Sequence, residues 1–391
     1  MLNNPSDGPG RPLKLLSPVS WVLSVFVLNG FASFAYVASM PGKQKTFWAM
    51  LAVMYVFLSG VTQTGIVFSA IMKLVKARWS GYLCKMGEIL TLSFFPVLVV
   101  TFLIIYTKGL SHLFYWASAQ RNENKPLNFF LNKDLFFWKN ILSMSLFYFL
   151  SYLYFKRNLK AEQTSSLDDY GQTGSNFLPA FVIMTYVIAN TNTSWDFGMT
   201  LIPRWESSIF PLYYCAGNLL AGSAFLFLMS GVFVVLWKKR KIGIKEIDPM
   251  GKLLLGFTLL WVYMFWSQFV RIWYGNLPYL TQPLIKRMSG PFASLFMMML
   301  IFSAGIPFLA LLFRKIRLSA GGLSAISLLT CAGIWLNCYL MVVPEFSDGW
   351  DPVFISWTGV SLILTGFSLL LISAMVFLKW FDDVAIRPAS F

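Results

Sequence analysis

The sequence has few charged residues and almost no histidine. Of its 391 residues, 12% are charged and 57% are hydrophobic. A soluble chain of this size could not cover its surface with so few charges, so the composition predicts a membrane protein with several spans. His112 is the only histidine. A haem with two histidine ligands therefore cannot form within this chain, which excludes a cytochrome b.

The spacing of the cysteines excludes further cofactor sites. The four cysteines lie within apolar segments and form no CxxC or CxxCH pattern, at Cys84, Cys215, Cys331 and Cys338. This pattern argues against an iron–sulfur cluster and against a covalently bound haem. The sequence also lacks a Walker loop, a GxGxxG motif after a strand and a serine hydrolase elbow. We therefore expect this chain to hold no metal and no cofactor of its own.

Long apolar runs dominate the chain. Each is close to the roughly 20 residues that cross a bilayer as a helix. They lie at residues 17–40, 47–72, 80–107, 135–155, 177–195, 209–237, 251–275, 290–313, 320–343 and 353–379. We predict an all-α integral membrane protein with ten transmembrane helices. The net charge of +15 then reflects basic loops facing the cytoplasm, and we expect no nucleic-acid binding.

Lysine and arginine are distributed unevenly between alternate loops. The set that includes both termini holds about twice as many as the other set, so both termini are predicted to be cytoplasmic, as tails 1–16 and 380–391. Basic clusters follow both the second and the sixth helix. This favours two parallel four-helix bundles, residues 47–195 and 209–343, joined by an outer loop 196–208. The first and tenth helices, 17–40 and 353–379, flank these bundles.

Two polar residues lie deep within the third predicted helix. Lys85 and Glu88 are three residues apart and share one face, and Glu88 lies about 15 Å in from the cytoplasmic Arg78. A carboxylate at this depth is costly unless it binds a proton or a partner. Two readings stay open: a static Lys85–Glu88 pair, or a proton-conducting group. Lys252 and Gln268 are further candidates for the same internal polar route.

A second set of polar residues lies at the predicted outer boundary of the membrane, where lipid gives way to water. The helix 177–195 ends in the polar run from Asn190 to Asp196, which must line a cavity or a helix interface. His112, Trp195, Asp196 and Arg271 lie at this boundary among several tryptophans and tyrosines. We take these four as candidates for a quinol site. The alternative for each charged residue is a salt bridge at the membrane surface, or a side chain that reaches out to the water there.

Several motifs together resemble the NrfD/polysulfide-reductase family of membrane subunits, most closely the F-type subunit of alternative complex III. One group of matching residues surrounds the fifth and sixth helices: Trp195, Asp196, Met199, Leu201, Pro203, Trp205, Ser207 to Phe210, Tyr213, Ala216 and Gly217. The others are Glu88, Ser111 to Trp116, Phe130 to Asn132, Gly251 to Leu254, Ser267, Gln268 and Ile272 to Pro278. Four residues depart from the family pattern and reduce the number of protonatable groups at the outer face: Ser111, Tyr115, Glu206 and Pro211.

The resemblance implies a function and a set of partners. It implies a bacterial inner-membrane subunit of a quinol:cytochrome c oxidoreductase, with a second NrfD-like subunit, an iron–sulfur subunit and c-type cytochromes as partners. Haem c and iron–sulfur clusters would lie in those partners, while this chain would contact quinol or carry protons. From the residues alone, a secondary transporter and a structural anchor for peripheral redox subunits remain alternatives.

Overall fold

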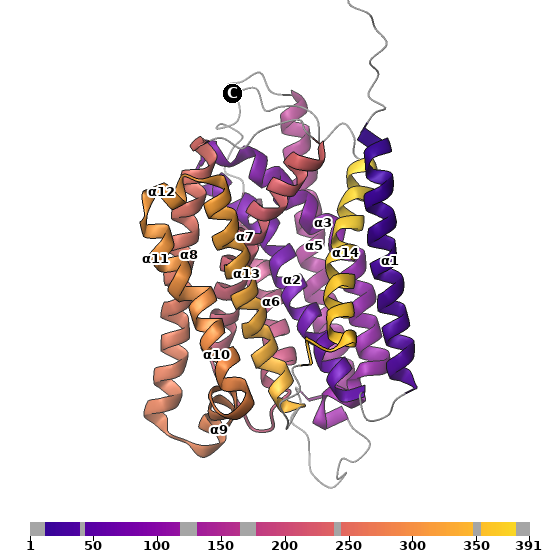
Figure 1. Ribbon diagram of the computed structural model, residues 1–391, viewed down its shortest axis with the longest axis vertical. Helices are drawn as coiled ribbons and strands as arrows, with labels where there is room; N and C mark the ends of the chain where they lie inside the picture. Colours follow the sequence, from indigo (N-terminus) through magenta and orange to yellow (C-terminus); the bar gives the residue numbers. More distant parts are fainter. Residues whose placement is uncertain are drawn as a thin grey trace, which may run out of the picture.

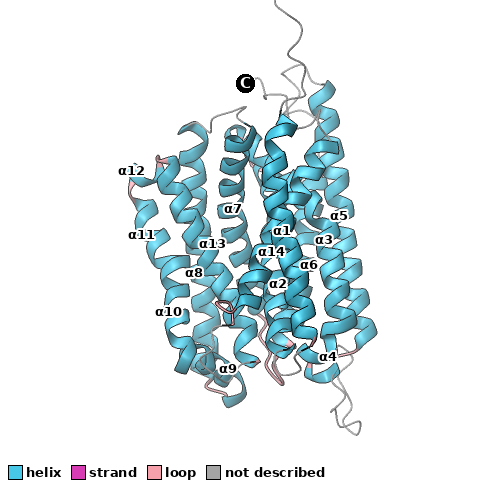
Figure 2. Cartoon of the chain, turned by 45° about the vertical axis from the view of Figure 1, so that its right-hand side comes forward, coloured by secondary structure: helices cyan, strands magenta, loops and turns pink. Residues whose placement is uncertain are grey.

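The computed structural model describes residues 12–39, 44–117, 131–164, 177–237, 244–346 and 353–380. Every regular element within these ranges is a helix, which confirms the all-α prediction (Figures 1 and 2). Eight segments are long and apolar enough to cross a membrane: Ser20–Val37, Gln44–Leu74, Gly81–Leu113, Phe210–Val232, Glu246–Gly275, Gly290–Leu312, Ala320–Glu345 and Trp357–Lys379. The chain is therefore a multi-pass membrane protein. The outermost parts of both tails, residues 118–130, the basic residues Lys238 to Lys241 and the acidic loop 347–352 lie outside the described residues.

The other two predicted segments also form helices. They are α5 (Lys133–Thr164) and α6 (Leu178–Ser194), which continues into a π-turn, Trp195–Met199. With 17 residues, α6 is shorter than the eight apolar segments. Helix α5 is more polar than the eight apolar segments, because it carries charged residues near both ends, among them Lys139 and Arg157.

Helix α2 (Gln44–Leu74) lies at the centre of the molecule. Most of its residues are buried, and it packs against α3 (Gly81–Ile104), α6 and α7 (Phe210–Trp237). The helices α1 (Pro12–Ala38) and α14 (Trp357–Trp380) pack against each other at the edge (Figure 1). Large apolar side chains such as Trp21 and Phe31 of α1 are exposed there. An apolar exterior of this kind suits contact with lipid.

A close crossing of two glycines joins α2 to α3. A Cβ added to Gly87 would lie 2.3 Å from the carbonyl oxygen of Gly65, and one added to Gly65 would lie 2.5 Å from that of Gly87. Only residues without a side chain allow backbones to approach this closely. The crossing positions Glu88, the residue after Gly87, against α2.

Two groups of helices lie side by side and pack closely on each other through α2 and α7. The first helical group consists of α2, α3, α5 and α6. The second consists of α7, α8 (Ile244–Gly275), α13 (Ala320–Val342) and one interrupted span. That span is formed by α10 (Ala293–Leu300), the π-turn Ile301–Gly305 and α11 (Ile306–Leu312). Short helices lie at the two ends of the molecule (Figures 1 and 2). One end, called the α9 end, holds α4 (Leu110–Leu113) and α9 (Pro278–Met288). The opposite end, called the α12 end, holds α12 (Arg314–Arg317). α1 begins and α14 ends at the α12 end (Figure 1).

Candidate functional site

Asp196 is a buried carboxylate at the α9 end of the first helical group. Its residue is 2% exposed and belongs to the π-turn that extends α6. Two neighbouring side chains of α5 bind it: Lys139 Nζ lies 2.7 Å from Oδ1, and Asn140 Nδ2 donates to Oδ2 at 2.5 Å. The lysine balances the negative charge, and the amide satisfies the second oxygen. A carboxylate bound in this way can remain ionised in a buried place.

Trp195 belongs to the same cluster. Its side chain is partly exposed, and Lys139 Nζ lies 6.0 Å from the centre of its ring, within range of a cation–π interaction. The structure therefore brings the two predicted residues Trp195 and Asp196 together around Lys139. This places one aromatic surface at the edge of the protein directly beside a buried ion pair.

Glu88 is the second buried carboxylate of the first helical group, and it is 3% exposed. Its Oε1 accepts hydrogen bonds from Ser69 Oγ of α2 at 2.6 Å and from Asn158 Nδ2 of α5 at 2.7 Å. The Tyr154 hydroxyl lies 3.1 Å from Ser69 Oγ, and Lys73 Nζ donates to Asn158 Oδ1 at 2.5 Å. Two helices thus hold this carboxylate in a polar network that ends in a lysine.

The predicted partner of Glu88 on its own helix is Lys85. This lysine lies about one turn before Glu88 on α3, and its side chain is partly buried. It shares the face of α3 predicted from the spacing. The choice between a static pair and a proton-transfer group stays a prediction for these two residues.

Helix α5 connects the two carboxylates. Asn140 binds Asp196 and Asn158 binds Glu88, and the stretch of helix between these asparagines is about 27 Å long. That length approaches the roughly 30 Å thickness of the hydrocarbon layer. Two buried hydroxyls on the same helix lie between them in the sequence, those of Tyr148, which is close to Thr62 and Gln63 of α2, and of Ser151.

A chain of side-chain amides crosses the middle of the molecule. Asn218 Nδ2 of α7 donates to Asn190 Oδ1 of α6 at 2.8 Å, and Asn190 Nδ2 donates to Gln63 Oε1 of α2 at 3.0 Å. All three residues are buried. The prediction that the polar end of the 177–195 segment lines a helix interface is therefore confirmed. These bonds tie the first helical group to α7.

Neither protein-family models nor curated proteins match the chain. Two carboxylates, each bound to amides and close to a lysine, can take up and release protons, and hydroxyl groups between them can both donate and accept hydrogen bonds. The first helical group therefore holds two buried groups that can bind or release a proton.

The remaining quinol-site candidates have other partners. His112, on α4, stacks on Trp48 with ring centres 6.2 Å apart and an angle of 5° between the rings. Arg271, on α8, is exposed, and its Nη1 donates to Ser208 Oγ at 2.6 Å. The described contacts thus place Trp195 and Asp196 in one cluster and leave His112 and Arg271 in two separate ones.

The proton-path candidates on α8 are also separate from Glu88. Lys252 has an exposed side chain and pairs with Asp248 at 2.6 Å, and Arg317 Nε also contacts Asp248, at 2.7 Å. Gln268 is buried in the second helical group, where its Oε1 accepts a hydrogen bond from Ser207 Oγ at 2.6 Å. The described contacts therefore do not join Lys252 and Gln268 to the network around Glu88.

The exposed position of Lys252 leads to a prediction about stability. Replacing Asp248 with asparagine removes the charge that both Arg317 and Lys252 contact, and we expect a loss of about 1 kcal/mol in the free energy of unfolding. Replacing Lys252 with methionine should change the melting temperature less, because 61% of its side chain is exposed. Thermal unfolding of both purified variants measures the difference. A larger effect for Lys252→Met would show that Lys252 has a role beyond this pair.

Several residues of the site were not predicted from the sequence. Lys139 and Asn140 interrupt the apolar run 135–155, and Lys139 in particular is the kind of charged residue within a span that indicates function. Ser69, Tyr154 and Asn158 carry no comparable signal, because serine, tyrosine and asparagine also occur in ordinary helix packing. Their role becomes visible only once α2, α3 and α5 are placed side by side.

Proposed function

We propose that this chain is an integral-membrane subunit of a quinol:electron-acceptor oxidoreductase complex, and that its first helical group carries protons between Asp196 and Glu88. The observation that supports this most strongly is α5, whose two asparagines bind buried carboxylates about 27 Å apart. The resemblance to the NrfD/polysulfide-reductase family supports the redox setting. A second NrfD-like subunit, an iron–sulfur subunit and c-type cytochromes would be its partners.

In this proposal the chain has ten spans in a bacterial cytoplasmic membrane. The spans of α5 and α6 complete the eight more apolar ones and give two four-helix bundles flanked by α1 and α14. Both termini lie on the cytoplasmic side, so the α9 end with Asp196 faces outward. This orientation is supported by the excess of lysine and arginine in the loops on the side of the termini.

The chemistry asked of this chain is limited to protons. Oxidation of a quinol releases two electrons and two protons, and iron–sulfur clusters and haem c in partner subunits would accept the electrons. Asp196 can accept a proton near the surface at which Trp195 is exposed, while Lys139 balances its charge when the proton leaves. The hydroxyls of Tyr148 and Ser151 lie on the way to Glu88, from which Lys73 and Asn158 lead towards the α12 end.

Replacement of Glu88 with glutamine tests the proton-transfer part of the proposal. Glutamine keeps the shape of the side chain and one acceptor oxygen, which can still accept from Ser69 and Asn158, but it cannot release a proton. We expect proton release and quinol turnover of the purified complex to fall at least about tenfold, in line with the loss of a positioned acid–base group. Both rates are measured on the same preparation, with an optical acceptor assay and a pH-sensitive dye.

Glu206→Gln is the matched control. Glu206 is also a glutamate, but it is exposed in the loop after the π-turn, so its replacement should leave both rates unchanged. A Glu88→Gln complex that assembles, oxidises quinol and releases protons like the unmodified complex would show that the proton-transfer assignment is wrong. That result would favour a structural anchor.

A further inference from the structure

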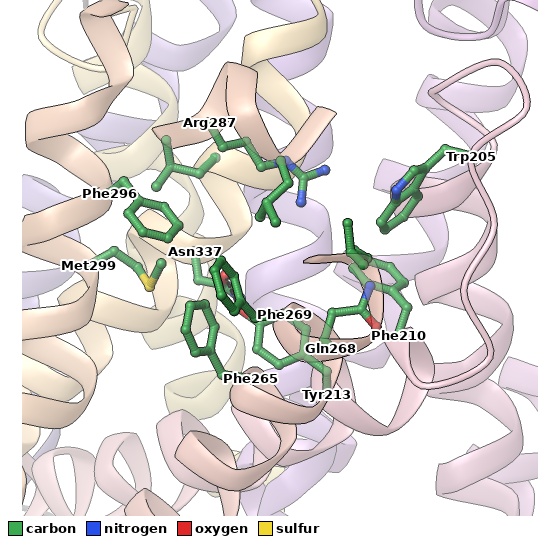
Figure 3. Close-up of a pocket in the computed structure, with 13 residues that line it drawn as sticks. Trp205, Phe210, Tyr213, Phe265, Gln268, Phe269, Arg287, Phe296, Met299 and Asn337 are labelled. Atoms are coloured by element: carbon green, nitrogen blue, oxygen red, sulfur yellow. Dashed lines mark hydrogen bonds between the residues drawn. The ribbon is translucent and has the colours of Figure 1, made fainter. Parts of the chain in front are cut away.

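A narrow cavity lies at the α9 end of the second helical group (Figure 3). Its accessible volume is about 40 Å³, enough for about three water molecules or one small polyatomic group. Its walls come from α7, α8, α9, α10 and α13. The polar groups that face it are Arg287, Gln268, Trp205, Tyr213 and Asn337.

Arg287 has more hydrogen-bond donors than the surrounding protein uses. Its Nε is buried without a hydrogen-bond partner, and its Nη2 makes one long bond, 3.4 Å, to the carbonyl oxygen of Met341. The guanidinium lies 5.5 Å from the centre of the Trp205 ring. Among the described residues it forms no ion pair; Glu345, the acidic residue that acts on it electrostatically, lies 4.0 Å from Lys286 instead.

Burial lowers the pKa of the Arg287 guanidinium, and the negative charge of Glu345 opposes this shift. An arginine nevertheless stays protonated in proteins at ordinary pH. Arg287 is partly buried as a residue, and Glu345 acts on its charge without forming a direct ion pair. A bound anion would pair directly with the guanidinium and use its free Nε–H.

Two uncharged donors face the same cavity. Gln268 accepts a hydrogen bond from Ser207 through its Oε1, which leaves its Nε2 buried without a partner. The indole Nε1 of Trp205 is also buried without a partner. The Oδ1 of Asn337, a potential acceptor in the wall, is already bound by the hydroxyl of Tyr213. The cavity thus offers N–H donors and one cation, a set that matches the oxygens of an anion.

We propose that this cavity binds the phosphate of an anionic phospholipid, held by Arg287, Gln268 and Trp205. The apolar wall formed by Phe265, Phe296 and Met299 would contact the start of an acyl chain, next to exposed residues of α8 such as Trp266. The lining contains no carboxylate and no histidine to take a proton from a quinol, which favours a charged headgroup over a quinol ring.

The test uses the full-length chain purified in a neutral detergent. Phosphatidylglycerol, phosphatidylcholine or inorganic phosphate is added, and binding is followed by native mass spectrometry and by the melting temperature. We expect phosphatidylglycerol to bind saturably and to raise the melting temperature more than either alternative. Two independent variants, Arg287→Gln and Gln268→Leu, should each weaken the binding of phosphatidylglycerol at least about tenfold, because each removes one hydrogen bond to the charged phosphate.

Lys315→Gln is the control, since it removes the same charge from an exposed position of α12, at the opposite end of the molecule from the cavity. It should bind phosphatidylglycerol nearly as well as the unmodified chain. Equal binding of phosphatidylglycerol to Arg287→Gln and the unmodified chain, or an equal loss in Lys315→Gln, would overturn the proposed site. Equal stabilisation by inorganic phosphate would show that the site takes a free anion and that the lipid assignment is wrong.

Discussion

Replacing Asp196 with asparagine should lower the free energy of unfolding by about 3 to 5 kcal/mol, because it removes one partner of a buried ion pair. Lys139 Nζ lies 2.7 Å from the carboxylate, and only 16% of the lysine side chain is exposed. Without Asp196, its ammonium group would stay buried and uncompensated. Reversible unfolding in mixed detergent micelles measures the difference.

The double variant Lys139→Met Asp196→Asn separates the pair from its surroundings. When both charges are removed, the buried ammonium no longer needs a partner, so most of the lost stability should return. Glu206→Gln, at an exposed carboxylate of the following loop, should leave stability unchanged. If Asp196→Asn alone unfolds like the unmodified protein, then Lys139 and Asp196 do not form a buried ion pair.

Replacing Gly87 with alanine should destabilise the chain by about 1 to 3 kcal/mol or more, because its new methyl group would meet the backbone of α2. The added Cβ would lie 2.3 Å from the carbonyl oxygen of Gly65, which cannot rotate away. The two helices must then separate. The same movement would lengthen the 2.6 Å contact between Ser69 and Glu88, so proton release by the complex should fall as well.

Gly256→Ala is the control for this glycine. Gly256 lies in the middle of α8, and a Cβ added there meets no atom within 4 Å. Alanine should be neutral there or stabilise the helix by about 0.5 to 1 kcal/mol, because it reduces the flexibility of the unfolded chain. Similar melting temperatures for Gly87→Ala and Gly256→Ala would show that the α2–α3 crossing tolerates a side chain.

The positions of the helices could largely be predicted from apolar length, whereas their ends could not. The seventh run was predicted from residue 251, but α8 begins at Ile244 and includes Glu246, Asp248 and Pro249. Hydropathy does not detect a helix that continues into a polar environment. It also missed α9, a short helix of mixed polarity, and the π-turn Ile301–Gly305 that interrupts the predicted 290–313 helix.

For the candidate site, the sequence identified the carboxylates but not their partners. Asp196 and Glu88 stand out because a carboxylate within an apolar run is costly. Asn158 of α5 and Ser69 of α2 bind Glu88. The spacing of residues along α3 cannot predict which side chains of other helices contact Glu88. Arg287 was missed for a related reason. It lies in a short polar segment, and its partial burial results from the packing of α9 against the second helical group.

The unbroken course of α5 has a mechanical consequence. One rigid helix holds Asn140 against Asp196 and Asn158 against Glu88, so the two ends cannot adjust independently. A slide of α5 along its axis would change the geometry of both amide–carboxylate contacts at the same time. Any partner that pushes on one end of this helix would thereby act on the carboxylate at its other end.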